Sequence, residues 1–76
     1  MILHGIYLRS RPKKSWHLVS VAISAEAANL ELETFLKKAL AQGNELAEVG
    51  IKTFDSSEYI PELYNSTMKP EKALFN

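Results

Sequence analysis

One segment of the chain, residues 25–42, has the pattern of an amphipathic helix, and it limits how much of a sheet can be covered. Ser24 is suited to cap the first turn, and Gly43-Asn44 supplies the left-handed residue that typically ends a helix. The sequence therefore predicts a helix of about 18 residues that starts near Ala25. Its apolar positions recur at spacings of three and four residues: Ala25, Ala28, Leu32, Phe35, Leu36, Ala39 and Leu40.

Two apolar segments precede the helix, residues 2–8 and 16–23, and both are rich in β-branched and aromatic residues. This composition is typical of strands. The connection between them, residues 9–15, holds one proline, four cations and no apolar residue. Such a segment is typical of a solvated loop, so the pattern predicts an antiparallel hairpin.

The chain after the helix predicts one further strand and less regular structure. Residues 46–54 alternate between apolar and polar side chains, as a half-buried strand does. Residues 59–64 predict a short C-terminal helical turn, which Pro61 keeps from continuing as a regular helix. Residues 66–76 have no sustained period, and we expect a mobile tail there.

This ββαβ order predicts a small α+β domain, residues 1–76, built as a two-layer sandwich. The single helix would cover one face of a three-stranded sheet, and a right-handed crossover would make the second and third strands parallel. A domain of this size buries only about 60% of its unfolded surface. The face away from the helix must then be polar, functional or covered by another part of the protein.

A hairpin centred near Pro12 and Lys13 pairs Ile6 with Val19, Ile2 with Ile23 and Tyr7 with Leu18. Two sheet faces follow from this register. The helix-facing set is Ile2, His4, Ile6, Leu8, His17, Val19, Val21, Ile23, Val49 and Ile51. The opposite set is Leu3, Gly5, Tyr7, Arg9, Trp16, Leu18, Ser20, Ala22, Lys52 and Phe54.

The second set is aromatic and cationic, which makes it a candidate interaction surface together with the basic hairpin loop. The predicted surface consists of Tyr7, Arg9, Arg11, Lys13, Lys14, Trp16, Leu18, Lys52 and Phe54. Three hypotheses account for it. It could stack single-stranded nucleic acid, it could be buried against a second copy of the chain, or the C-terminal segment with Tyr59, Ile60, Leu63, Leu74 and Phe75 could fold over it.

Charge is balanced overall, with nine Lys and Arg against nine Asp and Glu, but it is unevenly distributed. Residues 1–25 hold four cations and no acid, whereas residues 26–76 hold nine acids and five lysines. This asymmetry favours head-to-tail contacts, and the basic loop could also meet an acidic protein.

Catalytic and metal chemistry find little support in the sequence. The chain has no cysteine, and the predicted register places His4 and His17 about 13 Å apart, which is too far for one metal ion. No nucleophile or phosphate-loop motif is present, so we expect neither enzyme activity nor a cofactor. The lack of a signal peptide and of a long apolar run favours a cytoplasmic protein that does not bind membranes.

These observations favour a non-catalytic, homo-oligomeric protein-interaction or adaptor module, a dimer or a larger assembly. The alternative is a single-stranded nucleic-acid-binding protein that uses the aromatic and basic sheet face and the hairpin loop.

Overall fold

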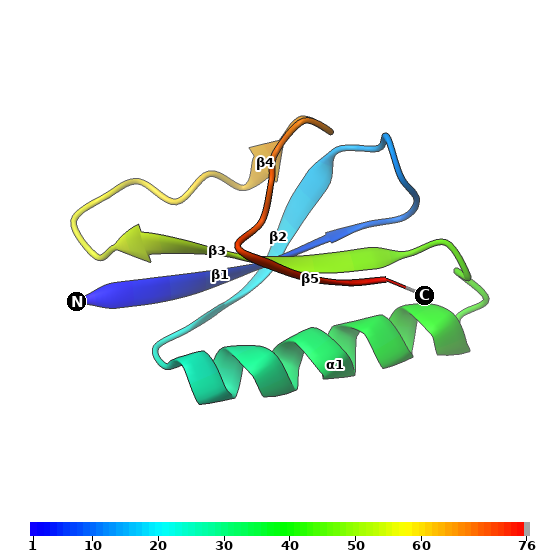
Figure 1. Ribbon diagram of the computed structural model, residues 1–76, viewed down its shortest axis with the longest axis horizontal. Helices are drawn as coiled ribbons and strands as arrows, with labels where there is room; N and C mark the ends of the chain where they lie inside the picture. Colours follow the sequence, from blue (N-terminus) through cyan, green and yellow to red (C-terminus); the bar gives the residue numbers. More distant parts are fainter. Residues whose placement is uncertain (76) are drawn as a thin grey trace.

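The computed structural model describes residues 1–75, with only the backbone of Phe75, so Asn76 at the end of the predicted tail lies outside the described residues. Five strands form one sheet: β1 (Ile2–Arg9), β2 (Trp16–Ala22), β3 (Glu48–Asp55), β4 (Leu63–Tyr64) and β5 (Lys72–Phe75). Their order is β4-β2-β1-β3-β5, and all neighbours are antiparallel (Figure 1).

The α+β two-layer architecture is confirmed, and the number of strands is corrected. Both β2 and β3 are antiparallel to β1, so they run in the same direction with β1 between them. The predicted sheet of three strands is wrong, because β4 adds to β2 at one edge and β5 adds to β3 at the other. Short C-terminal segments therefore extend the sheet on both sides.

The helix α1 (Ala25–Ala41) matches the sequence prediction in position and caps. The Ser24 hydroxyl oxygen accepts a hydrogen bond from the Ala27 amide at 3.1 Å, which satisfies a free donor of the first turn. Gly43 follows the helix with φ +85°, a conformation that glycine adopts without strain. Local sequence chemistry thus defines both ends of α1.

One face of the sheet packs against α1 and forms the first of two apolar clusters. Leu8, Ala27, Phe35, Leu36 and Leu74 pack around its margin. On the same face, the Ser20 hydroxyl donates to the Glu31 carboxylate at 2.7 Å, which ties β2 to the helix. The buried members of the cluster are Ile6, Ala22, Ala28, Leu32, Val49 and Ile51.

A β-bulge corrects the predicted register of the hairpin. Tyr7 pairs with Leu18 as predicted, but Ile6 pairs with Ser20, because Val19 is an extra residue in β2. A bulge reverses the faces of the residues beyond it. Ala22 accordingly packs toward the helix, while Val21 lies on the opposite face across from Gly5.

The predicted faces are therefore wrong for the second half of β2. Ser20 and Ala22 belong to the helix side, whereas Val19, Val21 and Ile23, expected in the core, are exposed. The predicted pair of Ile2 and Ile23 is also absent from the described register.

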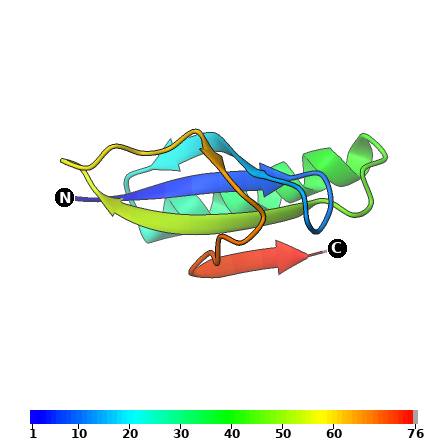
Figure 2. The same cartoon turned by 90° about the horizontal axis from the view of Figure 1, so that it is seen from above.

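Residues 56–70, which we call the covering segment, lie over the sheet face opposite α1. In Figure 1 the helix lies below the sheet and this segment, yellow to orange, lies above it; Figure 2 shows it crossing from the β2 side toward β5. The predicted helical turn at residues 59–64 is wrong, because residues 59–62 form no helix and residues 63–64 form β4. The Leu18 amide donates to the Glu62 carbonyl at 2.8 Å, so this backbone is held by the sheet rather than by its own turns.

Within the stretch where we expect a tail, residues 72–75 form β5 and pair with residues 48–51 of β3. Just before this strand, the Glu71 carboxylate accepts hydrogen bonds from the Thr53 amide and hydroxyl at 2.8 and 2.9 Å. The chain therefore remains attached to the sheet as far as Phe75.

The burial of Leu32 under the sheet makes it a direct test of the helix packing. Replacing Leu32 with alanine removes a fully buried side chain, and we expect the free energy of unfolding to fall by about 2 to 5 kcal/mol. The matched control is Leu30→Ala on the exposed side of the same helix, which we expect to stay within about 0.5 kcal/mol of wild type. Urea unfolding of both variants makes the comparison, and equal losses would contradict the described helix face.

Candidate interaction surfaces

The aromatic cluster, Tyr7, Trp16 and Phe54, is buried rather than displayed. Tyr7 is 0% exposed and Trp16 is 1% exposed. Ile60, Tyr64 and Met68 of the covering segment pack on these rings, and so does Leu18. The structure therefore covers this face with the chain's own C-terminal segment.

The covering residues differ in part from those considered in the sequence. Ile60 packs on the cluster, but Tyr59 and Leu63 are exposed and Leu74 packs on the helix side. The side chain of Phe75 lies outside the described residues. Tyr64 takes a central place, with its ring edge against Tyr7 at a centroid distance of 5.3 Å and an interplanar angle of 68°.

Tyr7 anchors the covering segment through a hydrogen bond. Its hydroxyl donates to the Pro61 carbonyl at 2.7 Å, across 54 positions of sequence. Burial of the phenol, with a smaller contribution from Tyr64, raises the pKa of Tyr7 to about 12. The neutral phenol is therefore the form that the folded protein stabilises.

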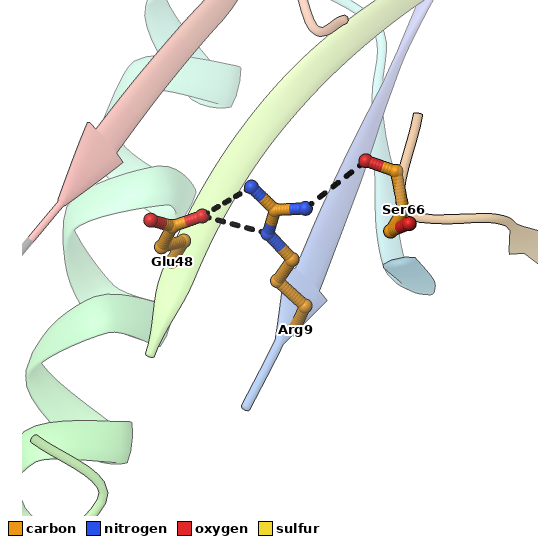
Figure 3. Close-up of polar contacts among 3 residues, drawn as sticks. All are labelled: Arg9, Glu48 and Ser66. Carbon is orange, nitrogen blue, oxygen red and sulfur yellow. Dashed lines mark hydrogen bonds and ion pairs between the residues drawn. The ribbon is translucent and has the colours of Figure 1, made fainter. Parts of the chain in front are cut away.

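Arg9 is the second anchor, and Figure 3 shows its polar contacts. Its Nε and Nη2 atoms lie 2.6 and 2.5 Å from Oε1 of Glu48, and its Nη1 donates to the Ser66 carbonyl at 3.3 Å. The guanidinium also lies over the Trp16 ring, 4.1 Å from the ring centroid. Arg9 thus joins β1, β3 and the covering segment, and its charge is neutralised within the fold.

Lys52 lies at the margin of the same cluster. Its Nζ atom is 6.0 Å from the centroids of both the Phe54 and Tyr64 rings, and its side chain is partly buried. The edge of the aromatic cluster is therefore next to a positive charge.

The remaining predicted cations, Arg11, Lys13 and Lys14, are exposed at the tip of the hairpin. The Lys14 amide donates to the Arg11 carbonyl at 3.2 Å, and Lys13 takes φ +73° to close the turn. The predicted interaction surface therefore separates into two parts. Its aromatic part lies in the interior with Arg9, and its basic loop lies in solvent.

The outer side of β2 is a surface that the sequence analysis misses. β4 pairs only with Trp16 and His17, and the Leu18 amide is bound to Glu62. Beyond Leu18, none of the described residues forms a backbone pair with this side of the strand. We call residues 19–23 the free edge.

The free edge is apolar and uncharged. Val19, Val21 and Ile23 are 38%, 41% and 69% exposed. Natural sheet edges are commonly protected from pairing by charged residues or proline, and this edge has neither. The sequence already shows that residues 19–23 contain no charged residue and no proline. The exposure of Val19, Val21 and Ile23, however, depends on the bulge at Val19.

The exposed charges separate toward the two ends of the molecule. The hairpin tip, the last turns of α1 and the loop after it lie at one end in Figure 1, which we call the basic end; its exposed cations Arg11, Lys13, Lys14, Lys37 and Lys38 outnumber the one exposed acid of that loop, Glu45. The start of α1 and the turn after β3 lie at the other end, which we call the acidic end; it carries Glu26, Asp55 and Glu58. The uneven charge of the sequence is therefore also uneven in space.

Asp55 is well suited to stay charged at the acidic end. The amide and hydroxyl of Ser57 donate to its Oδ1 at 3.0 and 2.8 Å. These hydrogen bonds lower the pKa of Asp55.

Residues 1–75 show no feature of a metal site, a ligand pocket or a membrane-spanning helix. No group of three or more His, Asp or Glu side chains could hold a metal ion, and no pocket is present in this part of the chain. No helix among these residues is long and apolar enough to span a membrane. Comparison with known protein families, with curated proteins and with solved structures gives no match.

The raised pKa of Tyr7 predicts a pH dependence of stability. The unfolded phenol ionises near pH 10, whereas the folded one ionises near 12, so the stabilisation by the neutral ring is complete below pH 10. It is lost as the pH rises from 10 toward about 12. Tyr7→Phe lacks this dependence, and it also loses the hydrogen bond to Pro61, which lowers its stability at pH 8 by about 1 kcal/mol.

Urea unfolding of both proteins between pH 8 and 12 tests this expectation. The two proteins differ only by the Tyr7 hydroxyl, so the difference between their stabilities isolates the contribution of this group, including its interaction with Tyr64. The stability difference should shrink above pH 10; a constant difference would contradict the described environment of Tyr7.

Proposed function

We propose that this chain is a non-catalytic protein-interaction module that self-associates by strand pairing at the free edge of β2. The observation that supports the proposal is the uncovered stretch from Val19 to Ile23, which combines unpaired backbone with exposed apolar side chains. Strand addition supplies backbone hydrogen bonds and buries alternate side chains, and this edge offers both.

The size of the molecule supports the same proposal. A chain of 76 residues has little interior, and β4 protects only the first part of β2. Pairing the rest of β2 would satisfy its outward backbone groups and shield Val21 from water. Association would therefore supply the backbone hydrogen bonds and the apolar burial that the second half of β2 lacks in a single chain.

The nucleic-acid alternative loses the groups on which it depends. Single-strand binding on a sheet uses exposed aromatic rings for stacking, and Tyr7 and Trp16 are fully buried. Arg9 is held by Glu48. The exposed cations Arg11, Lys13 and Lys14 lack a neighbouring aromatic platform in the described structure, so we do not propose this function.

Sedimentation velocity over the micromolar range tests the proposal with two matched variants. Val21→Lys places a charge in the free edge, and Leu30→Lys places the same charge on the exposed side of α1. We expect wild type and Leu30→Lys to associate and Val21→Lys to sediment as a monomer of 8.6 kDa, because a buried, unpaired lysine opposes strand pairing.

Thermal unfolding of the dilute variants serves as the control for folding, since a strand position tolerates lysine less well than a helix position. Val21→Thr, which keeps the β-branched shape, gives a second control that should fold like wild type. A wild-type chain that stays monomeric at about 100 µM, or equal association of both lysine variants, would contradict the proposal.

A further inference from the structure

We propose that the strand received by the free edge is β2 of a second copy, paired antiparallel about Val21, so that the assembly is a closed two-fold dimer. This inference rests on the proposed function, because it names the partner strand at the same edge. It goes further by fixing the register and the direction of the mate.

The limits of the free edge determine the register. On one side the edge begins after Leu18, whose amide is bound to Glu62, and on the other it ends where Ser24 caps the helix. The free stretch from residue 19 to residue 23 has Val21 at its centre. An antiparallel pair centred there places Val21 opposite the mate's Val21 and Val19 opposite the mate's Ile23.

This register makes the exposed side chains complementary to one another. Val19, Val21 and Ile23 each meet an apolar counterpart, since the pattern is symmetric about its centre. A shift by one or two residues would bring the free stretch against the mate's β4 or against its helix start, where no free backbone is available. The available length therefore allows one complete pairing.

The charges at the two ends select the antiparallel direction. β2 leads from the basic hairpin tip with Lys13 and Lys14 to the acidic start of α1 with Glu26. Antiparallel pairing sets the basic end of each copy beside the acidic end of its mate, and the two-fold axis repeats this arrangement. Parallel pairing would set basic beside basic and acidic beside acidic, which is unfavourable.

Two-fold pairing also closes the assembly. When β2 pairs with β2, the same surface is used on both copies, and neither free edge remains open. If the edge took β5 of another copy instead, each added chain would leave a new edge and the assembly could continue to grow. The proposal therefore predicts a dimer and no larger species.

Cysteine cross-linking can read this register directly, because the natural chain has no cysteine. Under mild oxidation we expect Val21→Cys to form a disulfide-linked dimer, since directly opposed strand residues lie within disulfide range. Val19→Cys should cross-link with Ile23→Cys in a mixture of the two, but not with itself, because two copies of residue 19 would be about 13 Å apart.

Two further variants separate the alternatives. Leu30→Cys, exposed on α1, controls for random collision and should not cross-link. Ala73→Cys lies on β5, and its cross-linking with Val21→Cys would show that β5 is the added strand and would overturn this inference. Raising the salt concentration should weaken dimerisation several-fold, since the interactions between the charged ends are screened.

The remaining outcomes distinguish this inference from the proposed function. If wild type associates and Val21→Lys does not, yet Val21→Cys fails to cross-link with itself, the register or partner strand is wrong and edge association stands. If wild type remains monomeric, the proposed function and this inference fail together.

Discussion

The packing of the covering segment on the aromatic cluster is the interaction on which the rest of the structure depends. A sheet with two apolar faces needs two covers, and the part of the chain that the structure describes has one helix. Residues 56–70 supply the second cover without forming a helix, because Ile60, Tyr64 and Met68 place their side chains on the rings. The backbone of this segment is attached by Tyr7 through the Pro61 carbonyl and by Arg9 through the Ser66 carbonyl.

A glycine in the sheet allows the end of the covering segment to pack closely on β3. Gly50 of β3 lies beneath Pro70, and a Cβ atom at Gly50 would come within 2.7 Å of the proline Cβ. A side chain there would push the end of the covering segment away from the sheet. The absence of a side chain at Gly50 therefore lets Pro70 pack directly on the backbone of β3. Immediately after Pro70, Glu71 and β5 bind along β3.

The Arg9 and Glu48 pair shows how charge is used inside this fold. Both side chains are largely buried, with exposed fractions of 14% and 11%, so removing one partner would leave a charge with little access to water. The guanidinium satisfies the carboxylate and a carbonyl while its flat face covers Trp16. The indole N–H of Trp16, by contrast, has no acceptor among the described residues.

The path of the covering segment also explains where β2 is left open. Among the described residues, the backbone of this segment pairs with β2 at residues 16–18, and the segment then crosses the sheet toward β5. The second half of β2 keeps its inner partner β1, and no other strand within residues 1–75 pairs with its outer side. The free edge is thus a consequence of using one short segment both to cover a face and to reach the opposite edge.

Sequence reasoning found the parts of this structure that depend on local chemistry. The caps at Ser24 and Gly43, the helix period, the hairpin and the alternation in β3 are all encoded within a few residues of where they act. The bulge at Val19 could not be found in this way, since it reflects a choice between long-range packing arrangements of β2. That one residue reversed the expected faces from Ser20 onward.

Long-range contacts also determine whether the predicted interaction surface is exposed or buried. The sequence grouped Tyr7, Trp16 and Phe54 on one face, and the structure confirms this grouping. Whether the face is open depends on the position of residues 56–70, which have weak local preferences and are positioned by contacts with distant residues. Covering by the C-terminal segment was one of three hypotheses, and only the three-dimensional structure could select it.

Trp16 fluorescence in dilute solution tests the central claim, that the chain itself covers the aromatic face. The chain has one tryptophan, so its emission reports a single site. At concentrations where sedimentation shows only monomer, we predict blue-shifted emission that acrylamide quenches poorly, because Trp16 is 1% exposed within one chain. Emission that is red-shifted and readily quenched in the monomer, and that becomes blue-shifted only on association, would contradict this account and would place the cover on a second copy.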